Sequence, residues 1–264
     1  MTFDTHKHHG HNYRHLIRRW RSLARRAGLK CQAFAIADEF ELFFLRSPAM
    51  QTHGGIYLSA GIHGDEAGGT EGLLFWAEMN VTLLKRLPVL LFPCLNPWGL
   101  VHNRRSDSEG RDLNRCYHLD DLERIRAQKA IIAGVTFRFA MCLHEDYDAQ
   151  GVYLYEVRNH LRPIGPELLA AAGYHLPVDL RPRIEGRRAE SGSIARRIKA
   201  LRFPFLPEAG LLALYHSDRT ITLETPSEYE LGARAQAQAA AVQRAVELTL
   251  SERKPEQSTV NSKR

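Results

Sequence analysis

The chain has 264 residues, of which 44% are hydrophobic and 25% are charged, with a net charge of +6 and a pI of about 9.2. This composition is ordinary for a soluble globular protein, and the length is enough for one large α/β domain or two small ones with a buried core. No apolar run approaches the roughly 20 residues that a membrane-spanning helix needs, which excludes a protein anchored by such a helix.

The four cysteines, at positions 31, 94, 116 and 142, are far apart and form no C-x-x-C pair. This spacing is typical of reduced thiols in a cytoplasmic protein and differs from a disulfide framework. The N-terminus is polar and rich in histidine, unlike a secretory signal. We therefore expect a cytoplasmic protein with no membrane partner.

Positive charge is concentrated in two segments, 13–26 and 181–202. Such runs are either solvated helix faces or contacts for an anionic substrate or a nucleic acid. No basic strand interleaved with aromatic residues and no known nucleic-acid motif is present, which favours solvated faces and predicts no nucleic-acid partner. For segment 181–202, a pocket-lining role and a solvated one both stay open.

The chain divides into a lead, one domain and a tail. Residues 1–12 are predicted to be a flexible lead, whose histidines lack a framework that would hold a metal. Residues 251–264 contain almost no apolar side chains and are predicted to be disordered. No internal repeat or linker divides residues 13–250, so these are expected to form a single domain.

Strand-like and helix-like segments alternate within this domain. The predicted strands are 40–46, 55–61, 87–95, 135–144, 151–157 and 220–225, and the predicted helices are 13–27, 66–80 and 228–250. The first helix carries an apolar stripe of Leu16, Trp20 and Leu23. This alternation indicates an α/β fold with a mixed, twisted sheet flanked by helices. Residues 160–215, rich in Pro, Gly and Arg, receive no assignment.

Polar side chains follow several of these strands at the point where each strand ends. His63 and Glu66 follow the strand 55–61, the sequence NPWG (96–99) follows 87–95, and His144 and Glu224 end two later strands. In sheets of this class, functional residues gather at the carboxyl ends of the strands. We therefore expect these scattered residues to converge in space.

Three of them have the chemistry of a metal site. His63 and Glu66 lie three residues apart among glycines and can supply two ligands from one turn, and His144 can supply the third. Two histidines and a glutamate form one ligand set of hydrolytic zinc sites, which leave one position for water. Glu224 is then the carboxylate that can complete hydrolysis. An isolated H-x-x-E is common in loops, so the hypothesis depends on the other residues.

The segment 103–117, NRRSDSEGRDLNRCY, adds groups that recognise anions. The guanidinium of Arg115 can bind a carboxylate bidentately, and the amide of Asn114 can bind the same group. Arg105 can face the oxyanion that develops in a tetrahedral intermediate. The alternative is an exposed loop that is merely rich in arginine.

Taken together, five ordered motifs resemble those of the zinc carboxypeptidase (M14-type) superfamily, which includes the succinylglutamate desuccinylase and aspartoacylase branch. They are GIHGDE, NPWG in place of the usual NPDG, GRDLNR, LH on a strand, and TLETPS, and they extend over about residues 59–226. The spacing around Arg105 resembles that of small bacterial members that process murein peptides. The resemblance implies a zinc-carboxypeptidase-like fold and a catalytic role for the domain 13–250.

The resemblance also implies a role for each candidate residue. The ligands of one Zn²⁺ would be His63, Glu66 and His144. The groups that bind the terminal carboxylate of the substrate would be Asn114 and Arg115, with Arg105 at the oxyanion. Glu224 would act as the general base and then as the proton donor to the leaving amine.

The sequence departs from the family pattern in three places. Trp98 replaces the usual Asp of NPDG, which we expect to alter packing beneath the site. His144 is followed by the acidic EDYD, where peptidases often have a small hydroxyl residue. A tyrosine that covers the substrate is not identified; Tyr215 lies in the right part of the chain, but an ordinary half-buried tyrosine explains it equally well.

The leading hypothesis is a zinc metallocarboxypeptidase that acts on small peptides, and the alternative is an N-acyl amino acid deacylase of the same chemistry. NPWG favours the peptidase, because the deacylases usually carry Ala where Gly99 stands, whereas the short stretch between Arg115 and His144 favours the more compact members. A non-catalytic binding protein would lack a ligand or the general base, and all four residues are present. A nucleic-acid-binding protein is suggested only by the pI. The preferred side chain and the oligomeric state stay open.

Overall fold

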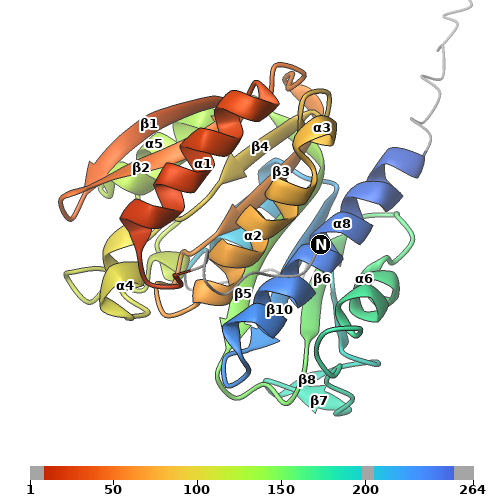
Figure 1. The fold of residues 1–264 in the computed structure, drawn as a ribbon. Coiled ribbons are helices and arrows are strands. Elements are labelled where there is room, and N and C mark those ends of the chain that lie inside the picture. Colours follow the sequence, from red (N-terminus) through yellow and green to blue (C-terminus); the bar gives the residue numbers. More distant parts are fainter. Residues whose placement is uncertain (1–8, 198–204, 253–264) are drawn as a thin grey trace, which may run out of the picture.

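A computed structural model describes residues 9–197 and 205–252. Residues 1–8 of the predicted lead and residues 253–264 of the predicted tail lie outside these ranges, as do residues 198–202 of the basic segment, so the predictions made for them stay predictions. The described residues form a single α/β domain built on an eight-stranded mixed sheet (Figure 1).

The sheet has the strand order β1-β2-β4-β3-β5-β10-β6-β9. Its strands are β1 (Lys30–Ala37), β2 (Phe40–Arg46), β3 (His53–Ala60), β4 (Val89–Phe92), β5 (Thr136–Asp146), β6 (Tyr153–Arg158), β9 (Ser193–Arg196) and β10 (Arg219–Pro226). A separate small hairpin pairs β7 (Arg183–Ile184) with β8 (Arg187–Arg188).

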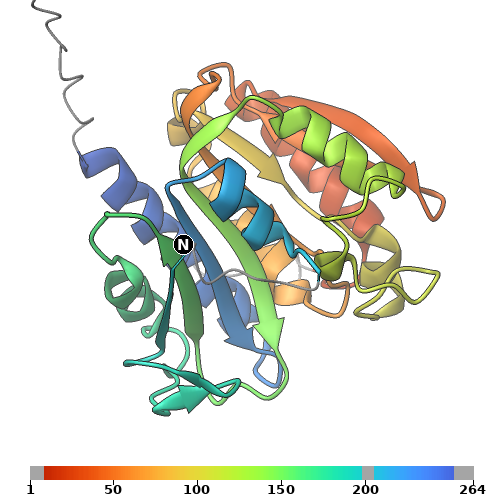
Figure 2. The ribbon, with the colours of Figure 1, turned by 180° about the vertical axis from the view of Figure 1, so that it is seen from behind.

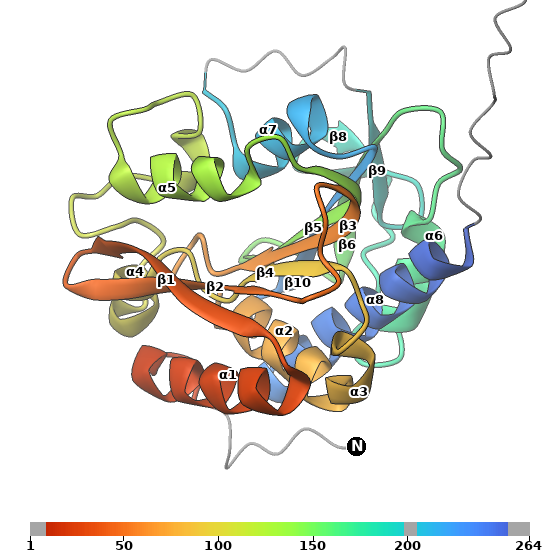
Figure 3. The same ribbon diagram turned by 90° about the horizontal axis from the view of Figure 1, so that it is seen from above.

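Helices cover both faces of the sheet, as the view in Figure 3 makes clear. One face carries α1 (Tyr13–Ala27), α2 (Ala67–Met79), α6 (Gly165–Ala172) and α8 (Leu231–Ser251), while α5 (Glu123–Ile132) and α7 (Glu208–Tyr215) lie on the other, which is seen in Figure 2. Each face of the sheet has its own hydrophobic core. Successive side chains of β3 point to opposite faces, so Ile56 and Leu58 pack in the first core and Tyr57 packs in the second.

The four central strands β4, β3, β5 and β10 are mutually parallel. The strands outside them, β2 and β6, run antiparallel to their inner neighbours. Because parallel strands end at the same edge of a sheet, the loops that follow β3, β4, β5 and β10 are brought together there. Two short helical segments, α4 (Pro97–His102) and a 3₁₀ turn (Leu113–Arg115), lie in the connection that follows β4.

The elements predicted from the sequence are found within a few residues of their expected limits, and the fold class is confirmed. The helix α1 and the strand β2 have the predicted limits. The unassigned region 160–215 contains α6, β7, β8, β9 and α7, all of eight residues or fewer, which leave little periodicity to detect. The described part of the chain contains no helix that is both long and apolar enough to cross a lipid bilayer.

Candidate metal centre and its cavity

The loop after β3 carries two of the predicted metal ligands, and glycine is required for its packing. A Cβ atom on Gly64 would lie 1.9 Å from the carbonyl carbon of Gly99, in the NPWG sequence. The two loops therefore touch backbone to backbone, which only glycine permits at this distance. Glu66 follows as the N-cap residue of α2, so its carboxylate lies where the strand edge meets the helix.

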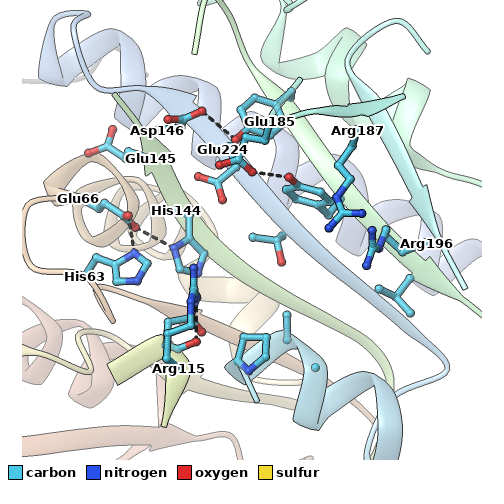
Figure 4. A pocket seen from close by; sticks show the side chains of 18 of the residues that line it. His63, Glu66, Arg115, His144, Glu145, Asp146, Glu185, Arg187, Arg196 and Glu224 are labelled. Atoms are coloured by element: carbon cyan, nitrogen blue, oxygen red, sulfur yellow. Dashed lines mark hydrogen bonds and ion pairs between the residues drawn. The ribbon is translucent and has the colours of Figure 1, made fainter. Parts of the chain in front are cut away.

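His63, Glu66 and His144 meet as predicted, from two neighbouring strands (Figure 4). Nδ1 of His63 lies 2.5 Å from Oε1 of Glu66, and Nδ1 of His144 lies 2.8 Å from Oε2 of the same carboxylate. One potential ligand atom from each residue lies within 4.8 Å of the others. Each residue is only 3% exposed, so three titratable groups share one buried site.

The chemistry of this cluster fits a divalent cation. Burial alone would lower the pKa of His63, but the charge of Glu66 and the hydrogen bonds with Asp112 and Glu66 raise it to about 9. Burial likewise opposes ionisation of Glu66, yet the two imidazoles beside it lower its pKa to about 2. The pKa of His144 is raised as well, despite its burial, because of the charge of Glu66, so the carboxylate favours positive charge on both rings, and a cation bound by the same three atoms would supply that charge instead. Two imidazoles and one carboxylate are a zinc ligand set.

Asp112 orients the first of these histidines. Nε2 of His63 donates to Oδ1 of Asp112 at 3.2 Å, which leaves Nδ1 for Glu66 and for a metal. Burial opposes ionisation of Asp112, but the hydrogen bond with His63 outweighs it and, with the nearby arginines, holds its pKa well below the usual range. A carboxylate behind a ligating imidazole is a recurrent device of metal sites, because it fixes the ring and its tautomer. The sequence analysis quoted this residue within GRDLNR and did not assign it a role.

Glu224 is placed beside the triad by strand pairing. In the register of the sheet, Glu224 on β10 lies opposite His144 on β5 and opposite Tyr153 on β6. It lines the same cavity as the triad. Burial raises its pKa well above the ordinary value, and although the charge of His144 lowers it, that of Glu66 raises it further. This environment makes the carboxylate of Glu224 a stronger base than that of an ordinary glutamate, which suits a group that accepts a proton.

Arg105 approaches the triad from the connection after β4. Its Nε and Nη2 donate to Oδ2 of Asp112 at 3.2 and 3.1 Å, and its Nη1 lies 3.5 Å from Oε1 of Glu66. The NPWG sequence holds this segment, because the amide of Asn96 donates to the carbonyl oxygens of Arg105 and Ser106 at 3.3 and 3.1 Å. The guanidinium of Arg105, which was predicted to face an oxyanion, therefore lies next to the predicted metal ligands.

Trp98, the departure within NPWG, stacks on His102 with 4.3 Å between ring centroids. It does not belong to the residues that line the cavity. Beneath the site, the backbone N–H of Gly99 donates to Oδ1 of Asn96 at 3.0 Å, and Gly99 packs against Gly64.

Asn114 and Arg115 lie in the 3₁₀ turn, whose N-cap is the side chain of Asp112. The backbone N–H of Glu208 donates to Oδ1 of Asn114 at 2.9 Å, which leaves the NH₂ group of that amide available. The guanidinium of Arg115 lies over the ring of Phe205, 4.9 Å from its centroid, and Nη1 donates to the carbonyl oxygen of Asn114 at 3.1 Å. No hydrogen bond or ion pair joins either residue to the triad in the described part of the chain.

All seven candidate residues line one cavity of about 320 Å³, which is at the small end of ligand sites. The wall opposite the triad is built from residues that the sequence analysis did not name individually, two of which belong to segment 181–202, for which a pocket-lining role stayed open. They are Tyr153, Tyr155 and Val157 of β6, Arg187 of the hairpin and Arg196 of β9. The alternation in GVYLYEV was the available signal for the two tyrosines, whereas nothing local distinguished the two arginines from their neighbours.

Glu145 explains the second departure from the family pattern. It accepts hydrogen bonds from the backbone N–H of Gly68 at 2.8 Å and from Arg234 at 2.7 Å, so its carboxylate is turned toward the start of α2. A Cβ atom on Gly68 would lie 2.3 Å from Oε1 of Glu145. Burial raises the pKa of Glu145 to about 7, although Arg234 acts against this shift. The residue therefore fixes the helix that carries Glu66.

Tyr215, considered above as a residue that covers the substrate, lies at the end of α7 and is 67% exposed. It does not line the cavity. The interpretation of Tyr215 as an ordinary half-buried tyrosine is wrong, because its side chain is largely in solvent.

Comparisons with known proteins agree with this arrangement. Residues 53–151 match the family model of the succinylglutamate desuccinylase/aspartoacylase catalytic domain. A search of curated proteins gave no match. Together with the His–Glu–His cluster, the family match supports a metal-dependent hydrolase.

Solved structures share the fold. A proposed metallopeptidase from Shewanella amazonensis is 23% identical, with a TM-score of 0.80 over 91% of this chain and 94% of that one. A metallo-carboxypeptidase from Burkholderia cenocepacia is 16% identical, with a TM-score of 0.66 over 90% and 69% of the two chains. Carboxypeptidase A from Helicoverpa armigera is 13% identical, with a TM-score of 0.57 over 88% and 74%. The family match and this common fold confirm the resemblance to the zinc carboxypeptidase-like superfamily, with its desuccinylase and aspartoacylase branch, that the ordered motifs indicated.

Proposed function

We propose that this protein is a zinc-dependent hydrolase that cleaves an amide bond next to a free carboxylate, and that it acts as a metallocarboxypeptidase on small peptides. One observation carries the proposal: a His–Glu–His cluster, a buried glutamate and an Asn–Arg pair all line one cavity. Each group matches one requirement of the reaction.

Asn114 and Arg115 bind the α-carboxylate of the terminal residue. The free NH₂ group of Asn114 and the guanidinium of Arg115 are adjacent donors, and an arginine fork pairs with a carboxylate through two parallel hydrogen bonds. Phe205 supports the guanidinium from one side. This clamp orients the scissile bond toward the triad, which lies in the same cavity.

His63, Glu66 and His144 would hold zinc, which when bound acts as a Lewis acid on the carbonyl group and acidifies water. Glu224 accepts the proton of the attacking water and returns it to the leaving nitrogen, a double role that its raised pKa favours. Arg105 places positive charge 3.5 Å from Glu66, where it stabilises the oxyanion that forms on the former carbonyl oxygen.

A deacylase that cleaves N-acyl amino acids is the second candidate, and the family match over residues 53–151 favours it. It needs the same metal site, general base and carboxylate clamp. The substrates of the two candidate enzymes differ only in the group on the acyl side of the scissile bond. An assay with both types of substrate therefore distinguishes the peptidase from the deacylase.

The test uses the purified protein loaded with zinc and three substrate pools: peptides with a free C-terminus, murein-type peptides, and N-acyl amino acids. Release of a primary amine from the first or second pool supports the peptidase, and release only from the third supports the deacylase. Glu224→Gln should keep its zinc and lose at least about 100-fold in kcat. His63→Ala and His144→Ala should lose zinc, and a full metal content in both variants would refute the ligand set.

A further inference from the structure

A network of buried hydrogen bonds lies between β3, α5 and α7, on the face of the sheet that α5 and α7 cover (Figure 3). At its centre is Glu208, the first residue of α7, which is only 1% exposed. The hydroxyl of Tyr57 donates to Oε1 of Glu208, and Nε2 of Gln128 donates to the same oxygen at 3.0 Å. The hydroxyl of Tyr117 donates to Oε1 of Gln128 at 2.6 Å. None of these four residues lines the cavity, so the reaction proposed above leaves the network unexplained.

The direction of each hydrogen bond in this network is fixed. Burial, and then the charge of Glu208, raise the pKa of Tyr57 well above its ordinary value, so the hydroxyl of Tyr57 stays protonated and remains a donor. The amide oxygen of Gln128 is occupied by Tyr117, which turns the NH₂ group toward Glu208. Burial of a carboxyl group costs free energy, and apolar side chains of similar volume are often at least as stable in such a place. Stability alone therefore does not account for Glu208.

The backbone of Glu208 holds one half of the carboxylate clamp, the pair Asn114 and Arg115. Its N–H donates to Oδ1 of Asn114 at 2.9 Å. An N–H group in the first turn of a helix has no acceptor within the helix, and here the amide of Asn114 supplies one. With Oδ1 engaged in this way, the NH₂ group of Asn114 is the part of the amide left to donate to a ligand. An amide rotated by half a turn would instead present its oxygen atom, which repels a carboxylate.

The side chain of Glu208 also anchors the segment 205–208, which runs beside the turn that carries the clamp. The backbone N–H of Tyr117 donates to the carbonyl oxygen of Leu206 at 2.9 Å, so the two segments are joined through their backbones. Glu208 alone among residues 205–208 is buried. The hydrogen bonds of its carboxyl group therefore tie this segment, and the N–H that it carries, to β3 and α5.

We propose that Glu208 is a positioning residue of the clamp: its buried side chain fixes the peptide N–H that turns the NH₂ group of Asn114 toward the α-carboxylate of the ligand. The inference rests on the proposed function, in which Asn114 and Arg115 take that carboxylate. Glu208 touches no substrate atom and acts through Asn114. When its side chain is removed, the N–H shifts, the amide of Asn114 rotates freely, and the selectivity for a carboxylate over a carboxamide falls, while the triad stays in place. The family match ends at residue 151 and so assigns Glu208 no role.

The first experiment follows this N–H by hydrogen exchange in the zinc-loaded protein and needs no ligand. In Glu208→Ala, the protection factor of the N–H at position 208 should fall at least about tenfold. In Glu208→Gln the protection should be kept, because the new amide oxygen can still accept from Tyr57 and Gln128. The control is Tyr117→Phe, which removes a hydroxyl from the same network and leaves both hydrogen bonds to Glu208 intact. A fall of the same size in this control would contradict the proposal, because loss of stability alone would then explain it.

The second experiment measures selectivity with N-acetyl-L-alanine and its carboxamide, which differ only in the terminal carboxylate. Calorimetry on the zinc-loaded Glu224→Gln protein gives both affinities without turnover. The carboxylate should bind at least about tenfold more tightly, and Glu208→Ala should reduce this ratio at least about fivefold. Glu208→Gln and Tyr117→Phe should keep the ratio. In the Asn114→Ala background, Glu208→Ala should change the ratio by less than about twofold, because Glu208 acts through Asn114, whereas a general structural defect would add to the loss.

The possible results separate this proposal from the proposed function. An unchanged protection factor in Glu208→Ala would overturn the proposal. If Glu208→Ala does not fold, Tyr57→Phe takes its place, because it removes one of the two hydrogen bonds to Glu208; it should lower the protection factor and the ratio about threefold, where Tyr117→Phe does not. If Arg115→Ala loses the preference for the carboxylate and Glu208→Ala keeps it, the proposed function stands and this proposal fails. If the parent binds both ligands equally but the protection falls as expected, the clamp of the proposed function fails and the link between Glu208 and Asn114 stands.

Discussion

Gly64→Ala tests whether the metal centre depends on the contact between two loop backbones. The new Cβ would lie 1.9 Å from the carbonyl carbon and 2.2 Å from the nitrogen of the Gly99–Leu100 peptide bond. Carbon atoms in contact are normally about 3.5–4.0 Å apart. Both partners are backbone, so no side chain can rotate away, and the loops must separate by about 1.5 Å to reach that contact distance.

The expected cost follows from this displacement. Overpacking of a well-packed site typically costs about 1–3 kcal/mol, and a clash with backbone on both sides belongs at the upper end, so we expect about 3 kcal/mol. His63 directly precedes Gly64 and moves with it. Because metal–ligand distances tolerate about ±0.2 Å, the zinc affinity should fall by at least about tenfold.

The assay has two parts: urea unfolding of the metal-free protein, and zinc affinity from competition with a chromophoric chelator. Gly110→Ala is the control, because its Cβ would meet nothing within 4 Å while its φ of +79° imposes backbone strain alone. It should lose about 1–2 kcal/mol and keep its zinc affinity. The reasoning is refuted if Gly64→Ala unfolds within about 0.5 kcal/mol of the parent and binds zinc equally well.

Three other outcomes are expected. Asp112→Asn, which weakens the acceptor behind His63, should lower zinc affinity about 10–100-fold in the same competition assay; an unchanged affinity would remove its orienting role. Arg115→Ala should raise KM about 10–100-fold for substrates with a free α-carboxylate, and an equal loss on amidated substrates would contradict the clamp. The pKa of Glu145 is about 7 when folded against an ordinary 4.5, so the unfolded chain releases this proton first and stability declines as pH rises between these values. In Glu145→Gln, the free energy of unfolding should decline by roughly 3 kcal/mol less over this pH range, as measured by unfolding at a series of pH values. The same pH dependence in both proteins would argue against the raised pKa.

The metal cluster and Glu224 could be predicted from the sequence because each of these residues follows or ends a recognisable strand. His144 closes an apolar run, Glu224 closes another, and the glycine-rich HGDE loop follows a third. Parallel pairing then brings strand ends together whatever lies between them in the chain. To predict that these residues meet in space, only the fold class had to be known, and the alternation of strands and helices in the sequence indicated it.

The opposite wall could not be predicted in the same way. The strands β7, β8 and β9 contain two to four residues each, too few for a period to appear. Arg187 and Arg196 stand beside Arg188 and Arg197 in the sequence. The register with β6 distinguishes Arg196, and the place of the β7–β8 hairpin distinguishes Arg187. The role of Glu145 could not be predicted either. Its side chain is buried against Gly68, at the start of a helix that lies far away in the sequence.

The strand β6 runs antiparallel to β10, so the parallel centre of the sheet ends there. The cavity is thus formed by two different parts of the fold, one on each side of this boundary. The predicted metal ligands and Glu224 lie at the ends of the central parallel strands, whereas the far wall of the cavity is supplied by β6, the edge strand β9 and a short hairpin. Substitutions in residues 183–196 can change the shape of this wall and leave the predicted metal ligands in place. Libraries that vary only residues 183–196 are therefore a direct route to altered selectivity on an intact reaction centre.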